Sequence, residues 1–150
     1  STHNPRKESD NMGVEIGIRY EGDLHCEAVH GPSGNRLMTD APVDNGGRGE
    51  AFSPTDLVAT ALGTCLLTII GLAAKRQGLR VDGVRAHVVK EMVSDPVRRI
   101  GALRADIRFP EGVVLTESER AMLETAARAC PVKQSLSPDV HIAMEFYYPD

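Results

Sequence analysis

The amino-acid sequence predicts an α+β fold with the element order βββ-α-ββ-α-β. Alternating strand patterns precede one long helical segment, two more strand patterns follow it, and a second helix stands before a last strand. Strands grouped in runs between helices, rather than in strict βαβ alternation, are typical of antiparallel sheets packed against helices. The chain has 150 residues, of which 41% are hydrophobic and 25% charged, so we expect a globular protein with a true core.

The first third of the chain carries the strand signals. Apolar and polar residues alternate over 14–20 and again over 24–28, on either side of a turn at Glu21-Gly22. A short third strand is expected over 36–40. The glycine-rich loop at 42–49 then leads to the helix, and its glycines lack the spacing of a phosphate-binding loop.

The longest helical signal begins at Ser53 and ends at Gly78. Ser53 is the expected N-cap and is followed by a proline, while Asp56 faces the positive end of the helix dipole. Lys75-Arg76 falls in the last turn, and Gly78 can adopt the left-handed conformation that ends a helix. Between residues 57 and 74 the polar side chains form one narrow stripe of threonines, Thr60, Thr64 and Thr68. We therefore expect the rest of the fold to cover this helix.

The strongly apolar stretch over 57–74 approaches the length of a membrane span. Its glycines, its threonines and its capped start instead predict a buried helix of a soluble protein. The polar residues at the start of the chain do not resemble a signal peptide, so we interpret residues 1–13 as a disordered arm or a cloning remnant and expect a cytoplasmic location. A net charge of -4 argues against binding to nucleic acid or to an anionic membrane.

The second half of the chain returns to strands. Strand patterns cover 84–88 and 103–109, and a capping box at Thr116–Glu119 opens a second helix. A short helix over 131–136 and a strand over 140–146 complete a single domain. We place this domain at residues 14–150.

The chain has no pattern that calls for a metal or a cofactor. The five histidines and three cysteines are scattered, without a paired metal-ligand motif, and an odd number of cysteines does not indicate a secreted disulfide framework. His87 and His141 lie in strand patterns, where a structural role is the simplest interpretation. The cysteines also lack the local signatures of papain-like or caspase-like nucleophiles.

The three thiols differ in their surroundings. Cys65 lies in the middle of the long helix, where it is either a small buried hydrophobe or a reactive thiol. Cys130 directly precedes Pro131 and is the expected N-cap of the short helix. There, backbone N–H groups and the nearby Lys133 favour a thiolate. Cys26 is expected in the core of the first hairpin.

Two cysteine motifs and the helix start combine into one pattern. The stretches are Phe52-Ser53-Pro54-Thr55-Asp56-Leu57, Ala61-Leu62-Gly63-Thr64-Cys65 and Cys130-Pro131-Val132-Lys133-Gln134-Ser135-Leu136. This pattern resembles the OsmC/Ohr family of osmotically inducible and organic-hydroperoxide-resistance proteins, over about residues 14 to 147, and Tyr20-Glu21-Gly22-Asp23 resembles the first family turn. The resemblance implies antiparallel sheets around two long central helices in an intertwined homodimer, and thiol-dependent reduction of organic hydroperoxides.

The resemblance also implies roles for individual residues. Cys65 matches the peroxidatic cysteine, which would become a sulfenic acid, and Cys130 matches the resolving cysteine, which would form a disulfide with it. A dithiol would then reduce the pair. The family commonly has a glutamate directly after the proline that opens the helix, whereas this chain has Thr55 there and Asp56 one place later.

The arginine that this glutamate holds in the family has no counterpart after the first turn, over residues 25–27. Arg36, Arg48, Glu50 or Asp56 could substitute from the loops. The departure leaves a second hypothesis, in which the dimer cleft binds a small apolar or thiol-bearing molecule with little turnover. A third is the same fold with idle cysteines.

Overall fold

The computed structural model describes residues 13–149, and the chain divides into two compact units, residues 1–54 and 55–150. The predicted arm lies outside the described residues except for its last residue. The regular elements are β1 (Ile16–Gly22), β2 (His25–His30), β3 (Arg36–Asp40), the 3-10 turn η2 (Val43–Asn45), α2 (Pro54–Arg76), β4 (Arg85–Val93), β5 (Arg99–Arg108), α3 (Glu117–Arg128), α4 (Pro131–Ser135) and β6 (His141–Tyr147). This order confirms the predicted fold class.

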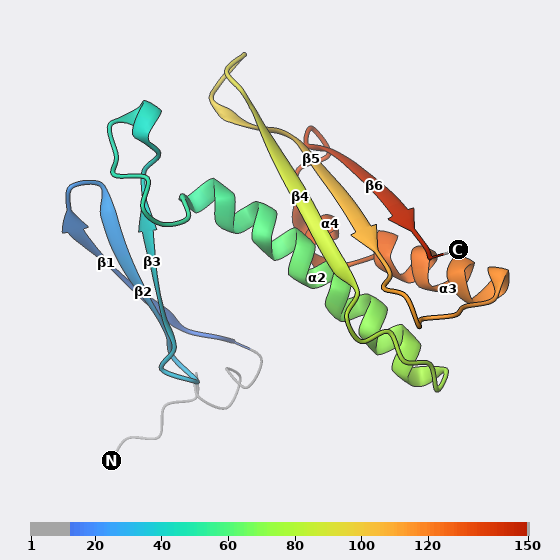
Figure 1. Cartoon of the computed structure of the whole chain (residues 1–150). Coiled ribbons are helices and arrows are strands. Elements are labelled where there is room, and N and C mark those ends of the chain that lie inside the picture. Colours follow the sequence, from blue (N-terminus) through green and yellow to red (C-terminus); the bar gives the residue numbers. More distant parts are fainter. Residues whose placement is uncertain (1–12, 150) are drawn as a thin grey trace. The chain divides into compact units, whose positions relative to one another are not determined.

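In the N-terminal unit, β1, β2 and β3 form an antiparallel three-stranded sheet in chain order (Figure 1). Ile18 lies opposite Ala28, and Ala28 lies opposite Leu37, so these apolar residues share one face. That face is open in the chain: Ile18 is 71% exposed and Ile16 is 56% exposed. An open apolar face indicates that this sheet needs a further surface to cover it.

The turn between β1 and β2 differs from the prediction. Asp23 and Leu24 both adopt left-handed backbone conformations, with φ of 56° and 59°. Two such residues in succession give a tight hairpin turn the same right-handed twist as the two strands that it joins. Leu24 therefore belongs to the turn, and its predicted place in the strand is wrong.

Cys26 shares the open face of the sheet, opposite Tyr20, and is partly exposed instead of lying in a closed core.

In the C-terminal unit, the second sheet has the strand order β4-β5-β6 (Figure 1). β4 and β5 pair antiparallel as expected, but β5 and β6 pair parallel. The prediction of antiparallel pairing is wrong for this last strand. The connection through α3 and α4 returns the chain to the end of the sheet where β5 began, so that β6 runs in the same direction as β5.

Both long helices of this unit pack on one face of its sheet. A Cβ atom added at Gly63 of α2 would lie 3.1 Å from Val88, which is opposite Ala105 in the sheet. The guanidinium of Arg128, at the end of α3, lies 5.1 Å from the ring of Phe146, which is on the same face. The core between the helices and the sheet includes Leu62, Leu66, Ile70, Leu103, Ile107 and Leu123, all fully buried. This core holds the middle of α2 against β4 and β5.

The ends of α2 follow the local sequence signals. Asp56 lies in its first turn, Lys75-Arg76 lies in its last turn, and Gly78 has a left-handed φ of 69°. The predicted threonine stripe is exposed, and each of its hydroxyls donates to a carbonyl one turn earlier. The helix is long and apolar enough to cross a membrane by length and composition, with 33% of its most apolar window buried. One such helix is weak evidence for a span, because core helices of soluble proteins have the same properties.

Candidate functional site

Two of the predicted site residues, Cys65 and Cys130, interact directly within the C-terminal unit. Cys65 lies in the middle of α2 and is partly buried, whereas Cys130 is fully buried between α3 and α4. The two thiols lie near enough for Cys65 to affect the ionisation of Cys130, and both sulfurs are free rather than linked in a disulfide. Thiols this close can form a disulfide if one of them is oxidised.

Cys130 is the N-cap of α4, as predicted. Its sulfur accepts a hydrogen bond from the backbone N–H of Lys133 at 3.4 Å. The predicted consequence, a stabilised thiolate, is wrong. Burial raises the pKa of Cys130 and outweighs the opposite effect of the Lys133 N–H, and the nearby Cys65 adds a smaller upward contribution. Cys130 therefore keeps its proton at neutral pH.

Asp56 belongs to a charged cluster at the start of α2. Its carboxylate lies 2.8 Å from the Lys90 ammonium, which also donates to the Thr55 hydroxyl at 2.8 Å. Lys90 projects from β4 toward the helices, because it lies opposite Leu103 in the sheet. This contact fixes the first turn of α2 to β4. It gives Asp56 a lysine partner, where the resemblance implied an arginine.

The remaining predicted charged residues lie in the N-terminal unit. Arg48 lies 3.8 Å from the Asp23 carboxylate, and the Glu50 backbone N–H donates to Asp40 at 3.2 Å. Arg36 donates to the carboxylate of Glu27 on the neighbouring strand. The roles of Arg48 and Glu50 at Cys65 stay predictions.

A polar cluster that the sequence did not predict centres on Asp40. This carboxylate is only 2% exposed and lies 2.5 Å from the His25 Nδ1. The hydrogen bond from His25 is the main reason that the pKa of Asp40 is lowered, with smaller contributions from Glu50 and Arg48. Asp40 thus remains ionised and ties the end of β3 to β2 and to the loop before α2.

Signals for both unpredicted polar residues exist in the sequence. Asp40 ends a strand directly before the glycine-rich loop, and the strand register brings it opposite His25. Lys90 interrupts an alternating apolar series on β4, Ala86, Val88, Lys90 and Met92. A lysine at an inward position of a strand indicates an ionic partner on the element that covers that face. Within residues 13–149, no three metal-ligating side chains converge.

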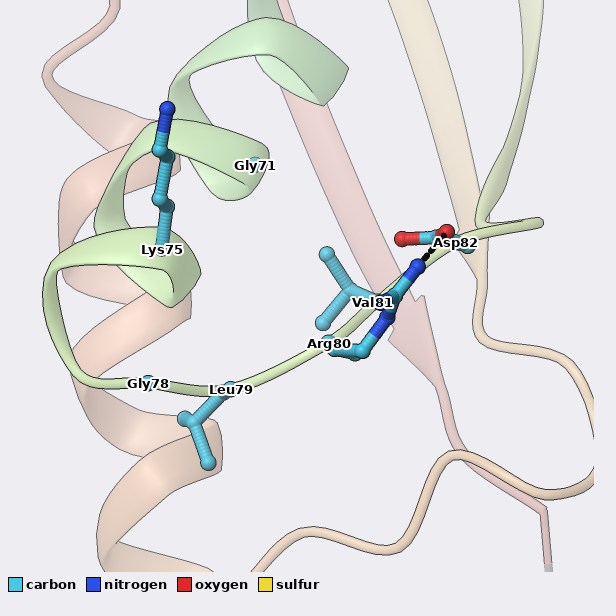
Figure 2. Close-up of a pocket in the computed structure, with 7 residues that line it drawn as sticks. All are labelled: Gly71, Lys75, Gly78, Leu79, Arg80, Val81 and Asp82. Carbon is cyan, nitrogen blue, oxygen red and sulfur yellow. Dashed lines mark hydrogen bonds and ion pairs between the residues drawn. The ribbon is translucent and has the colours of Figure 1, made fainter.

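The surface pocket in Figure 2 lies away from the cysteines, at the C-terminal end of α2, and has a volume of about 490 Å³. Arg80 and Asp82 form an ion pair at 2.8 Å in its wall, and Lys75 extends away from them (Figure 2). None of its lining residues was predicted as a site residue. We therefore do not assign this pocket to the thiol site.

Comparison with known protein families supports the resemblance. The family model for OsmC-like proteins matches residues 47–145, a segment that contains both Cys65 and Cys130. No curated protein sequence matches the chain significantly.

Solved structures show the same fold. A Psychrobacter arcticus protein, provisionally named an osmotic stress induced and detoxification response protein, is 41% identical, with a TM-score of 0.82 over 87% of this chain and 93% of that one. The organic hydroperoxide resistance protein OsmC of Legionella pneumophila is 18% identical, with a TM-score of 0.70 over 89% and 96%. OhrB of Bacillus subtilis, an organic hydroperoxide resistance protein, is 16% identical, with a TM-score of 0.62 over 89% and 96%. The last two likenesses concern the fold alone.

Proposed function

Because this chain belongs to the OsmC-like family, we propose that it reduces organic hydroperoxides to alcohols, with Cys65 and Cys130 as its redox pair. The observation that carries the proposal is the proximity of the two thiols, which lie 65 positions apart in the sequence. The names of the Legionella and Bacillus proteins of the same fold support the choice of substrate.

In the proposed cycle, the thiolate of Cys65 attacks the outer oxygen of the hydroperoxide and the O–O bond breaks. Cys65 becomes a sulfenic acid, and the departing alkoxide takes a proton to become an alcohol. The sulfur of Cys130 then attacks the Cys65 sulfur, which releases water and leaves a disulfide. An external dithiol reduces this disulfide and restores both thiols.

The raised pKa of Cys130 suits its part in this cycle. A protonated Cys130 does not compete with Cys65 for the peroxide, because only a thiolate is an effective nucleophile. We propose Asp56, Glu50 and Arg48 as the charged residues that orient the reacting groups, with Asp56 acting through the start of the helix that carries Cys65.

Single-turnover kinetics with cumene hydroperoxide, followed by turnover with dithiothreitol, test the redox pair. Cys65→Ser should abolish rapid peroxide consumption, because it removes the proposed attacking thiolate. Cys130→Ser should consume one equivalent and stop at the sulfenic acid. Cys26→Ser is the matched control and should behave as the wild type, since Cys26 lies in the other unit on a sheet face. Unchanged activity in Cys65→Ser would refute the proposal.

The binding hypothesis is favoured by one specific observation, the ion pair between Asp56 and Lys90. A lysine that holds this carboxylate differs from the glutamate and arginine arrangement that the resemblance implied. If the wild-type protein reacts with cumene hydroperoxide no faster than free dithiothreitol does, the protein is a binder of small apolar or thiol-bearing molecules. A rate above that of the free thiol excludes this hypothesis.

We also propose that the protein is a cytoplasmic homodimer. The first sheet has an open apolar face, and α2 is apolar on most of its surface. A second copy of the chain has the same two surfaces, so in a dimer each copy could cover the apolar surfaces of the other. Light scattering should give twice the chain mass at micromolar concentration. A folded monomer at that concentration would contradict the dimer.

A further inference from the structure

We propose that a pocket beside Arg120, in the C-terminal unit, binds a small organic carboxylate. The pocket has a volume of about 410 Å³ and lies between the loop that precedes α3 and the residues that follow β6. It is lined by Glu111, Gly112, Val113, Val114, Arg120 and Pro149. None of these residues takes part in the proposed peroxidase chemistry, so a result that refutes one proposal leaves the other unaffected.

Arg120 is held in place by an aromatic platform. Its guanidinium lies 4.3 Å from the centroid of the Tyr148 ring, and Tyr148 in turn stacks on Phe109 with ring centroids 4.7 Å apart. A guanidinium stacked on a ring loses less conformational freedom when it forms hydrogen bonds, because its planar group is already oriented. The platform therefore presents a fixed cation at the pocket.

The acidic residue one turn along α3 is engaged elsewhere. Glu124 accepts a hydrogen bond from the Tyr148 hydroxyl at 2.7 Å and lies 3.5 Å from Arg128. Burial and the contact with Glu124 raise the pKa of Tyr148, so the hydroxyl keeps its proton and this hydrogen bond persists. Arg120 forms no ion pair with any residue in the part of the chain that the structure describes.

Arg120 also has an unmet hydrogen-bonding requirement. Within residues 13–149, its Nε is the single buried side-chain nitrogen or oxygen without a hydrogen-bond partner. A buried donor without an acceptor is costly, and such atoms are rare in folded proteins. The Nε itself is closed to a ligand, but Arg120 is partly exposed and lines the pocket, so a carboxylate there can accept two parallel hydrogen bonds from the terminal nitrogens of its guanidinium. Such a ligand would give this cation the anionic partner that the described side chains do not supply.

The other walls of the pocket narrow the class of ligand. Val113, Val114 and Pro149 form an apolar wall, and Val114 is 88% exposed. An apolar group on the ligand would shield this side chain from water. Glu111 at the rim would repel a dianion more strongly than a monoanion. These features favour a short aliphatic monocarboxylate over inorganic phosphate.

Butyrate is a suitable probe, and ¹H–¹⁵N NMR of the arginine Nε–Hε groups in the full chain is a direct readout. Butyrate should shift the Arg120 signal saturably at millimolar concentration, whereas butyramide, its neutral analogue, should not. Arg120→Gln should weaken butyrate binding by about tenfold or more, read from the methyl signals of Val114. Glu111→Gln should strengthen binding by about twofold to fivefold, because it removes the repulsion at the rim.

Arg98→Gln is the matched control, because Arg98 is an exposed arginine outside the pocket and its substitution changes the net charge equally. It should leave butyrate binding unchanged. The proposal is overturned if the Arg120 signal does not move, if butyramide shifts it as much as butyrate, or if Arg98→Gln weakens binding as much as Arg120→Gln. Because Glu111→Gln should tighten binding, weaker binding in that variant also counts against the site, even if Arg120→Gln fails to fold.

Discussion

The two units of this chain are stabilised in different ways. In the C-terminal unit the side chains of Leu62, Leu66 and Leu103 are fully buried between helices and sheet. In residues 13–54 the buried side chains are instead polar, Asp40 and Ser53. One sheet thus packs on an apolar core, whereas the strands of the other are joined by their backbone pairing and enclose a hydrogen-bonded carboxylate at one end.

The two sheets differ in what covers their apolar faces. The second sheet has two helices on its apolar face, so its pattern of alternating residues is satisfied within the chain. The first sheet has the same alternation but an open apolar face, with Ile18 71% exposed. A strand pattern therefore predicts which face is apolar, but it does not say what covers that face.

The largest effect should come from the apolar core. Leu103→Ala removes a fully buried side chain between α2 and the sheet, and we expect a loss of about 2–5 kcal/mol in the free energy of unfolding. Denaturant unfolding measures it. The control is Val97→Ala, at a side chain that is 61% exposed, and should change this free energy by less than about 0.5 kcal/mol. Similar losses in both variants would mean that the apolar core does not dominate the stability of the C-terminal unit.

A smaller and more local effect is expected in the N-terminal unit. Asp40→Ala removes the acceptor of the Glu50 N–H and of His25. Hydrogen exchange at the Glu50 amide should accelerate by about tenfold or more, in line with one lost hydrogen bond to a charged group. Asp44→Ala, in the exposed part of the same loop, should leave this rate unchanged. If both variants exchange alike, Asp40 does not hold the loop.

The same carboxylate predicts a dependence on pH. The pKa of Asp40 is lowered from an ordinary value of 3.8, chiefly by the hydrogen bond with His25. A lowered folded pKa means that the stabilisation is complete above pH 3.8 and is lost as the pH falls below that value. Amide exchange in β2 and β3 should accelerate in this acid range in the wild type. Asp40→Ala should lack that step.

The smallest effect is expected for the ion pair at the start of α2. Lys90→Met keeps most of the apolar stem and removes the contact with Asp56, which is 46% exposed. Because water screens a half-exposed pair, the free energy of unfolding should change by less than about 1 kcal/mol. Lys75→Met, at the other end of the helix, is the control. A loss as large as that of Leu103→Ala would mean that this ion pair stabilises the C-terminal unit as strongly as its apolar core does.

Local signals in the sequence were sufficient to predict several features of the fold. The end of α2, with Lys75-Arg76 and the left-handed Gly78, follows from the chemistry of a helix terminus. The capping box of Thr116 and Glu119 is formed as predicted, and Cys130 caps α4 because the residue after it is a proline. These features depend only on residues that are close together in the sequence, so a local sequence pattern is sufficient to predict them.

Other features depended on residues that are distant in the chain. The parallel pairing of β6 and the pairing of His25 with Asp40 arise when separate strands meet. The pKa of Cys130 is a further example, because burial and the contact with Cys65 outweigh the local N–H that favoured a thiolate. The sequence by itself determined the order of the elements and the ends of the helices. The tertiary structure decided strand direction, burial and protonation, because these quantities depend on which distant groups surround a residue.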